Sequence, residues 1–155
     1  MDREELLRRY AAGERDFSGV DLSGASLSYV QVPNIILRDS NLSNAQMNFS
    51  DLSFADLSGA NLSGASLEET PFQKANLSRA NLNKALFFQS YLGRVDFSHT
   101  NLSGAVLTEC VLKNSNFSYA NLSGVRDFNI ARCKGAIFHE TIMPDGSIRT
   151  DAPSN

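Results

Sequence analysis

Residues 52–86 of this chain read LSFAD LSGAN LSGAS LEETP FQKAN LSRAN LNKAL when the sequence is divided into groups of five. Each group begins with Leu or Phe, and every fifth residue from 17 to 122 is Leu, Phe, Val or Met. A period of five matches neither the 3.6-residue period of a helix nor the alternation of a strand. Such a short and regular repeat is typical of a solenoid, in which successive coils stack on one another.

The residue two positions before each large apolar residue is mostly small, with Ala at ten repeats and Ser, Thr or Val at most others. Because residues two apart on an extended chain point to the same side, both are expected to face inward. The positions that follow each large residue are rich in Ser, Gly, Asn and Asp, which favour turns. The sequence therefore predicts a short extended side followed by a corner, repeated along the chain.

The number of sides in each coil follows from positions spaced by twenty residues. In one such column every member is Leu, preceded by Asp or Asn and followed by Ser or Asn: Leu22, Leu42, Leu62, Leu82, Leu102 and Leu122. A spacing of fifteen destroys this order. Four pentapeptides therefore form one coil, and the Asn residues are expected to form a ladder of side chains between stacked coils.

At these residues the chain resembles the pentapeptide repeat family, whose repeat reads A-(D/N)-L-x-x. Matches include residues 55–59, 60–64 and 80–84, and the resemblance extends over residues 15–143. It implies an all-β fold, namely a right-handed quadrilateral parallel β-helix of about six coils. The small and the large residue of each repeat would lie inside. The resemblance also implies a small soluble member of the kind that is numerous in cyanobacteria.

Residues 1–14 are expected to form a capping helix on the first coil. Asp2 can cap this helix with Glu5 three residues later, and Leu6, Leu7 and Tyr10 form an apolar stripe. A helix here would cover an end that otherwise exposes unpaired backbone groups. A helix that binds a partner is the alternative.

The regular β-helix is expected over residues 15–124. The next large residue would then be Asp127, which is unfavourable in an apolar column. A one-residue phase slip within 125–127 restores large inward residues over 125–143 at Phe128, Cys133, Phe138 and Met143, with Ala131 and Ala136 as their small inward partners. Residues 144–155 are expected to form a C-terminal turn and tail.

The two cysteines are expected to be buried free thiols. Cys110 occupies a small inward position and Cys133 a large one, two residues apart along the strand and one coil apart. This places their Cα atoms about 8 Å apart, beyond the reach of a disulfide. Two cysteines, and a start without an apolar secretory segment, favour the cytoplasm.

The composition and motifs argue against several functions. A net charge of −3 predicts neither a nucleic acid nor a membrane surface as partner. His99 and His139 are the only histidines, both at outward positions, and no Cys/His cluster has metal-ligand spacing. A solenoid with a filled core has no pocket for a small-molecule substrate. We therefore predict no catalytic residues, no cofactor and no metal.

Apolar residues at outward positions are the candidate site. Five of them are expected to lie near one another on two neighbouring faces: Leu86, Phe88, Tyr91, Val106 and Val111. They favour a protein contact, either with a partner or by self-association. The alternative is that outward apolar residues only favour strand geometry.

A second function follows from the resemblance alone. The family includes members that imitate DNA and bind a type II topoisomerase (gyrase) through acidic faces. Acids that would serve this role lie on the two regular faces: Asp16, Asp21, Asp56 and Asp96. Against it, basic residues stand at corners around the middle of the chain: Lys74, Arg79, Lys84 and Arg94.

Overall fold

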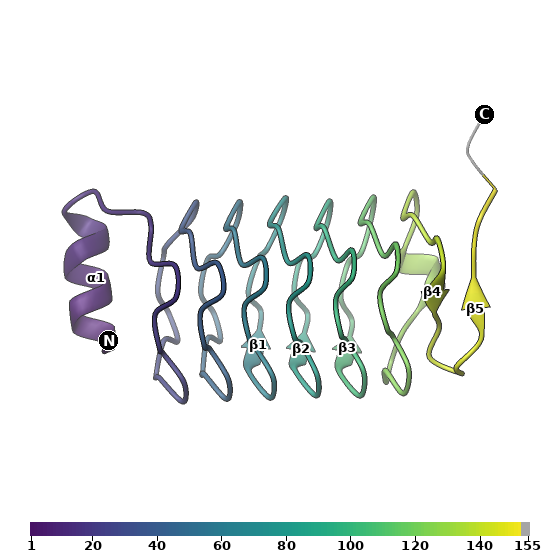
Figure 1. The fold of residues 1–155 in the computed structure, drawn as a ribbon, viewed down its shortest axis with the longest axis horizontal. Helices are drawn as coiled ribbons and strands as arrows, with labels where there is room; N and C mark the ends of the chain where they lie inside the picture. The colour runs from purple at the N-terminus through teal and green to yellow at the C-terminus, as the bar shows by residue number, and fades with distance from the viewer. Residues whose placement is uncertain (153–155) are drawn as a thin grey trace.

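In this computed structural model, which describes residues 1–152, the chain winds into a rod of stacked coils with helix α1 (Arg3–Ala11) at one end (Figure 1). Residues 153–155 of the expected tail lie outside the described residues. Parallel bridges join residues twenty apart, such as Asp16 with Ile36 and Asn61 with Asn81. Four pentapeptides therefore complete one coil, as the column spacing predicts.

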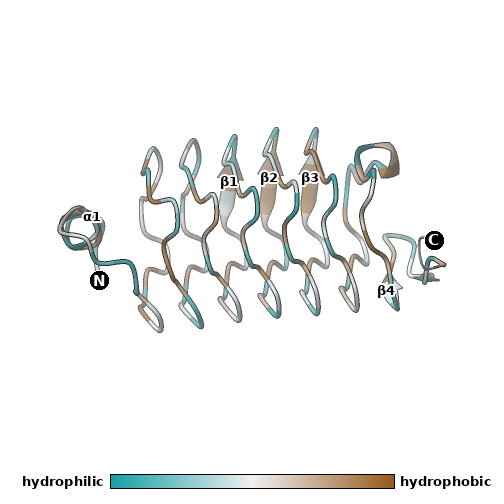
Figure 2. Cartoon of the chain, turned by 90° about the horizontal axis from the view of Figure 1, so that it is seen from above, coloured by the Kyte–Doolittle hydropathy of each residue, from teal (hydrophilic) through white to brown (hydrophobic). Residues whose placement is uncertain are grey.

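The strands are short because each side of a coil has room for only a few extended residues. One parallel sheet contains β1 (Ser66–Glu68), β2 (Leu86–Phe88) and β3 (Val106–Thr108), with neighbouring strands in a twenty-residue register. In Figure 2, β2 and β3 carry the hydrophobic colour and β1 is paler. The difference arises from the outward residues, which are polar in β1 and apolar in β2.

The core is a set of continuous columns. Every fifth residue from 17 to 122 is buried, and Leu62 and Leu82 have 0% of their surface exposed. The small positions between them are mostly buried as well, as Ala or as Ser and Thr at most repeats. In the predicted Asn ladder, Asn81 Nδ2 donates to Asn61 Oδ1 at 3.3 Å. These buried columns fill the interior of the rod. Side chains that could bind a partner therefore lie on its outer surface.

The four faces are named here by their first large residue. The first, second, third and fourth faces begin at Phe17, Leu22, Leu27 and Val32, and each continues at intervals of twenty. The chain turns each corner at the second residue after the large one, where φ is positive even for Lys74 (59°) and Arg94 (59°). These left-handed corner residues are mostly exposed and form columns along the edges of the rod.

Helix α1 covers the first coil and completes its hydrogen bonds. Asp2 Oδ1 caps the helix by accepting from the Glu5 N–H at 2.8 Å, and Leu6 is buried against the core. The Arg3 guanidinium donates to the carbonyl oxygens of Ser26 (3.1 Å) and Ser28 (2.7 Å). The first coil has no preceding coil to donate to these carbonyls, so the helix supplies donors in its place.

At the other end the register changes by one residue. Val106 still pairs with Arg126, twenty residues on, whereas Asn116 pairs with Ile137, twenty-one residues on. Asp127, with a positive φ of 59°, lies between these pairs and precedes the short 3-10 helix η1 (Ile130–Arg132).

The expectation that Ala131 faces inward is wrong. Ala131 is exposed on η1, where its N–H bonds to the Asn129 side chain, because the 3-10 turn replaces the extended side here. Cys133 and Phe138 are buried, and Phe128, Ala136 and Met143 are half-buried against the core.

The rod ends in an antiparallel pair, β4 (Thr141–Ile142) and β5 (Ile148–Arg149), at the end opposite α1 (Figure 1). The Arg149 guanidinium lies over the Phe138 ring at 4.3 Å, which covers part of the last coil. Among the described residues, no helix has the length and apolar character needed to cross a membrane.

Candidate interaction surface

The third face carries the most exposed part of the predicted contact patch. Leu86 and Phe88 flank the buried Phe87 on β2 and are 47% and 38% exposed. The register of β2 with β3 places Val106, which is half-buried, directly beside Leu86. These three residues therefore form one contiguous apolar area.

The other two predicted residues lie on the fourth face. Tyr91 is 44% exposed and pairs with the half-buried Val111 on the next coil. The Tyr91 ring lies over Gly93. A Cβ atom at Gly93 would lie only 2.8 Å from the Cζ atom of this ring. Gly93 is thus the residue that lets an aromatic ring lie close to this face.

A polar corner separates the two parts of the patch. Between the third and fourth faces, Gln89 Nε2 donates to Glu109 Oε2 one coil further on. Glu69 occupies the same column one coil earlier. The sequence reasoning missed this acidic column, although its spacing of twenty residues was available as a signal.

Two columns of corner residues border the fourth face. We call the column between the third and fourth faces the acidic corner. We call the column between the fourth and first faces the basic corner. Over four coils the acidic corner comprises Phe49, Glu69, Gln89 and Glu109. The basic corner comprises Phe54, Lys74, Arg94 and Asn114. Lys74 Nζ lies 5.5 Å from the centre of the Phe54 ring, a cation–π contact.

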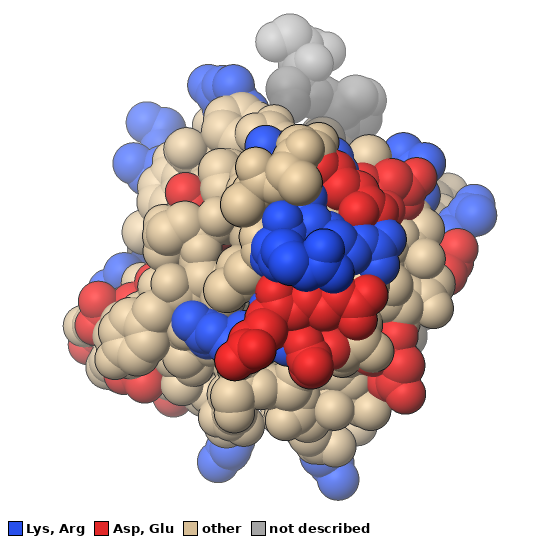
Figure 3. Space-filling model, turned by 90° about the vertical axis from the view of Figure 1, so that its left-hand side faces the viewer, with Lys and Arg blue, Asp and Glu red and all other residues tan. Residues whose placement is uncertain are grey.

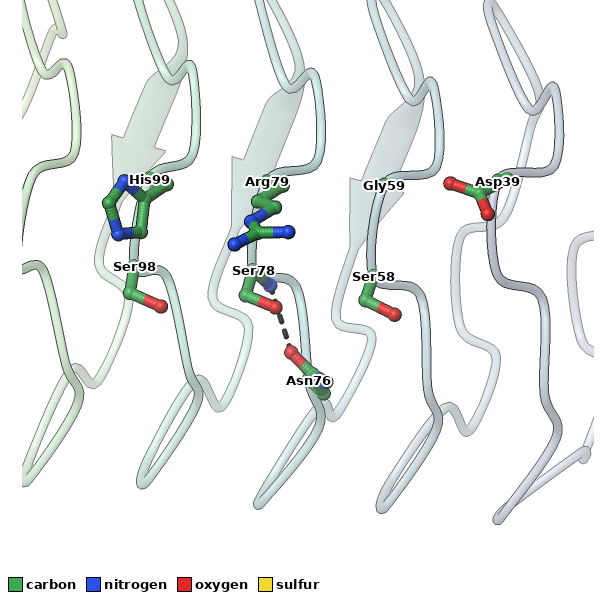
Figure 4. Close-up of a pocket in the computed structure, with 8 residues that line it drawn as sticks. All are labelled: Asp39, Ser58, Gly59, Asn76, Ser78, Arg79, Ser98 and His99. Atoms are coloured by element: carbon green, nitrogen blue, oxygen red, sulfur yellow. Dashed lines mark hydrogen bonds between the residues drawn. The ribbon is translucent and has the colours of Figure 1, made fainter.

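The first face and its corner form a shallow polar hollow. Figure 4 shows Asp39, Gly59, Arg79 and His99 in one row on successive coils, with serines in a second row. The hollow arises because Gly59 has no side chain between Asp39 and Arg79. The His99 ring stacks on the Tyr119 ring, with centroids 4.8 Å apart. His139 packs edge-on against Tyr119 from the other side, at 5.2 Å.

The aspartates that precede large residues cap the turns. In the first face, the hydroxyl and the N–H of Ser18 both donate to Asp16, and these bonds lower the pKa of Asp16. Partial burial acts to raise the pKa of Asp56, but hydrogen bonds from Ser58 and Arg38 outweigh it and the net shift is downward. These carboxylates are therefore tied to the local turn chemistry.

Charges of both signs are distributed over the rod. Arg38 Nε lies 2.6 Å from Asp56 Oδ2, so one acid of the first face is paired. Lys74, Arg79, Lys84 and Arg94 are exposed at corners. At the end covered by α1, basic and acidic side chains lie next to one another (Figure 3).

Both cysteines are buried free thiols, as predicted. Burial raises the pKa of Cys110 and of Cys133 to about 11. Within residues 1–152, no three side chains of His, Cys, Asp or Glu gather closely enough to hold a metal ion.

Stacked coils with four short sides and a filled core define a quadrilateral β-helix, a class of repeat protein. The sequence model described as "Pentapeptide repeats" matches residues 16–53, 50–87 and 90–126. The chain belongs to the pentapeptide repeat family. Members of this family are generally structural or binding proteins, and the fold of the family is a right-handed β-helix.

Solved structures with this fold include one from a plant. A pentapeptide repeat protein of the Arabidopsis thaliana thylakoid lumen is 34% identical, with a TM-score of 0.60, over 62% of this chain and 67% of that chain. QnrB1, a plasmid-mediated fluoroquinolone resistance protein, is 22% identical, with a TM-score of 0.56, over 83% of this chain and 59% of its own. This second likeness concerns the fold alone.

A pentapeptide repeat protein of the cyanobacterium Nostoc is 28% identical over 87% of this chain and 93% of its own, with a TM-score of 0.37. None of the curated proteins matches this chain.

Proposed function

We propose that this protein is a non-enzymatic, rigid scaffold that binds a protein partner through the contact patch formed by Leu86, Phe88, Tyr91, Val106 and Val111. The observation that carries the proposal is the cluster on the third face. Leu86 and Phe88 are 47% and 38% exposed beside Val106, on strands held in register by the coils around them. Clustered apolar surface on a rigid support is typical of protein contacts.

The position of this cluster argues against the alternative that its apolar residues only favour strand geometry. The same outward column carries Gln46 and Ser66 on the preceding coils and Arg126 on the following one. Ser66 lies in β1 with the same strand geometry as Leu86 and Val106, but it is polar. The apolar residues are thus confined to two adjacent coils, as expected for a local binding site.

We also place the protein in the cytoplasm. Cys110 and Cys133 are both free thiols, which suits a reducing compartment. No cofactor, metal or small-molecule substrate is required for the proposed role.

The proposal is tested by the double variant Leu86→Asp with Val106→Asp. Because both side chains point outward, we expect unchanged circular dichroism and only a small change in melting temperature. Proteins captured from the source cell by the wild type are identified, and their binding is measured with purified components. We expect the variant to lose this binding.

The matched control is Gln46→Asp with Ser66→Asp, which adds the same charge to the same column two coils earlier. The control should bind as the wild type does. Equal binding by the Leu86/Val106 variant and the wild type would exclude this surface as the contact.

A second candidate function is imitation of DNA toward a type II topoisomerase such as gyrase. It is favoured by the first face, where Asp16 and Asp56 share a column with Asp96 and the pKa values of the first two are lowered. The adjoining corners carry Arg79 and Lys84, which oppose a continuous negative surface. Inhibition of gyrase supercoiling that weakens with salt would support this role, and no inhibition would remove it.

A further inference from the structure

The two corners that border the fourth face are complementary coil by coil. On each coil, a residue of the acidic corner is followed five residues later by one of the basic corner. The successive pairs are Phe49 with Phe54, Glu69 with Lys74, Gln89 with Arg94, and Glu109 with Asn114, which adjoins Lys113. Over four consecutive coils, an aromatic residue at one edge of the face therefore has an aromatic residue at the other edge, and an acid or amide has a base or amide.

The first and second faces do not share this property, and on the third face the acids Glu69 and Glu109 stand across from Gly64 and Gly104. The corners that border the first face bring Lys74 beside Arg79 and Arg94 beside His99. Those of the second face bring Arg79 beside Lys84 on the same coil. Among the regular coils, an acid and a base stand at the two edges of one face only at Glu69 and Lys74, on the fourth face.

We propose that the fourth face is the contact surface for a second copy of this chain, with the two rods parallel and side by side. A two-fold axis that runs along the rods, between the two fourth faces, brings the acidic corner of each copy onto the basic corner of the other. Glu69 of one copy then faces Lys74 of the second copy, and the reverse. An antiparallel arrangement instead brings acid onto acid and base onto base.

The middle of the fourth face fits the same arrangement. The two-fold rotation places the residue before each large residue of one copy opposite the residue after the same large residue of the second copy. Tyr91, whose ring lies over Gly93 of its own chain, then meets the Tyr91 ring of the second copy. Val111 meets the aliphatic stem of Lys113, and the half-buried Asp51 meets Ser53. Pro71 meets the exposed Gln73, so no pair on these four coils brings two like charges together.

The charges involved are available for such a contact. Within residues 1–152, Glu69, Lys74, Arg94 and Glu109 take part in no ion pair. Five coils of the fourth face span about 24 Å along the rod. A contact of this size belongs to the weak, charge-sensitive class, so we expect association in the micromolar range or weaker that decreases with salt.

This inference rests on the proposed role in protein binding, but it uses only the fourth-face part of the contact patch. Leu86, Phe88 and Val106 lie on the third face and remain free for another partner. The two proposals can therefore fail separately.

The test uses two single charge reversals, Glu69→Lys and Lys74→Glu, in the full chain. Each variant replaces two attractive contacts of the dimer by two repulsive ones. We expect the dissociation constant, measured by sedimentation velocity at low salt, to rise by about tenfold or more for each. A mixture of the two variants should dimerise as the wild type does. In the mixed dimer, the two lysines of the Glu69→Lys variant face the two glutamates of the Lys74→Glu variant, so both attractive contacts are restored.

Two further proteins serve as controls. Lys84→Glu reverses a corner charge away from the fourth face and should not change the dissociation constant. Leu86→Asp with Val106→Asp should also dimerise normally. Three outcomes would overturn the parallel dimer. The wild type stays monomeric at about 1 mM, the single variants dimerise as the wild type does, or the mixture of the two variants does not restore dimerisation.

Discussion

The backbone N–H of Thr70 donates a hydrogen bond of 3.1 Å to the Oγ of Ser90, which lies one coil further along the rod. The Ser90 hydroxyl in turn donates to the carbonyl oxygen of Leu67 at 2.6 Å. At alanine positions the corresponding N–H bonds to the carbonyl three residues earlier, as Ala80 N does to Leu77 O at 3.1 Å. Ser90 thus joins two coils inside the core.

Substitution of Ser90 by Ala should destabilise the protein more than its small change in volume suggests. The change leaves the buried N–H of Thr70 without its acceptor, and an unsatisfied buried donor costs about 1–3 kcal/mol. The control is Ser40→Ala, because the Ser40 hydroxyl only donates, to the Phe17 carbonyl oxygen at 3.1 Å. Denaturant unfolding should give the larger loss for Ser90→Ala, and equal losses would contradict the assigned role.

Substitution of Arg3 by Ala should loosen the first coil. The guanidinium donates to the carbonyls of Ser26 and Ser28, so its loss opens the edge to water. We expect amide hydrogen exchange in residues 15–50 to rise at least about fivefold, the effect of losing one of these two hydrogen bonds, with little change near β2. Arg8→Ala, on the same helix, is the control. A uniform change along the rod would argue against a local cap.

Acid should destabilise the first coil through Asp21. Hydrogen bonds from the N–H and hydroxyl of Ser23 lower the pKa of Asp21 below its unfolded value. A lowered folded pKa gives stability that is present above the unfolded pKa and is lost as the pH falls through the folded one, here below about pH 4.

Asp21→Asn tests this assignment, since an amide oxygen can still accept from the Ser23 N–H but cannot titrate. The variant should lose less stability than the wild type between about pH 4 and pH 2 in thermal unfolding. Identical acid profiles would show that Asp21 does not contribute.

The two thiols should be unreactive in the folded protein. Burial raises the pKa of both Cys110 and Cys133 to about 11, so they stay protonated and shielded at pH 8. A thiol reagent should modify them only after unfolding, and mass spectrometry should find no intramolecular disulfide. Rapid labelling of the native protein would contradict the burial of these residues.

Alkaline pH should also weaken the fold. A thiol pKa that is raised on folding gives stability that is present below the unfolded pKa and is lost as the pH rises toward about 11. Cys110→Ala, which places the usual small residue at this position, should reduce the loss of stability above about pH 9.

Much of this molecule could be predicted from local chemistry. The large residues at every fifth position, the small residues two before them and the twenty-residue columns were sufficient for the filled core and the four sides, as at Leu62 and Leu82. These patterns were sufficient because every repeat buries two side chains and forms one turn within five residues.

Ala131 could not be predicted in this way. The pattern places it inward, but the one-residue change of register near Asp127 leads the chain into η1 in place of an extended side. The hydroxyl of Ser90 is a second example, since its link to Thr70 depends on the coil beside it and not on its own repeat.

The sequence by itself thus determined the rod, because burial and turn formation repeat within five residues. Only the tertiary structure decided how the outward side chains interact, such as Gln89 with Glu109, and where the chain leaves the repeat, as at Ala131. The physical reason is that outward positions are free of the packing constraint. Their relationships arise only when the closed coils bring residues twenty apart side by side.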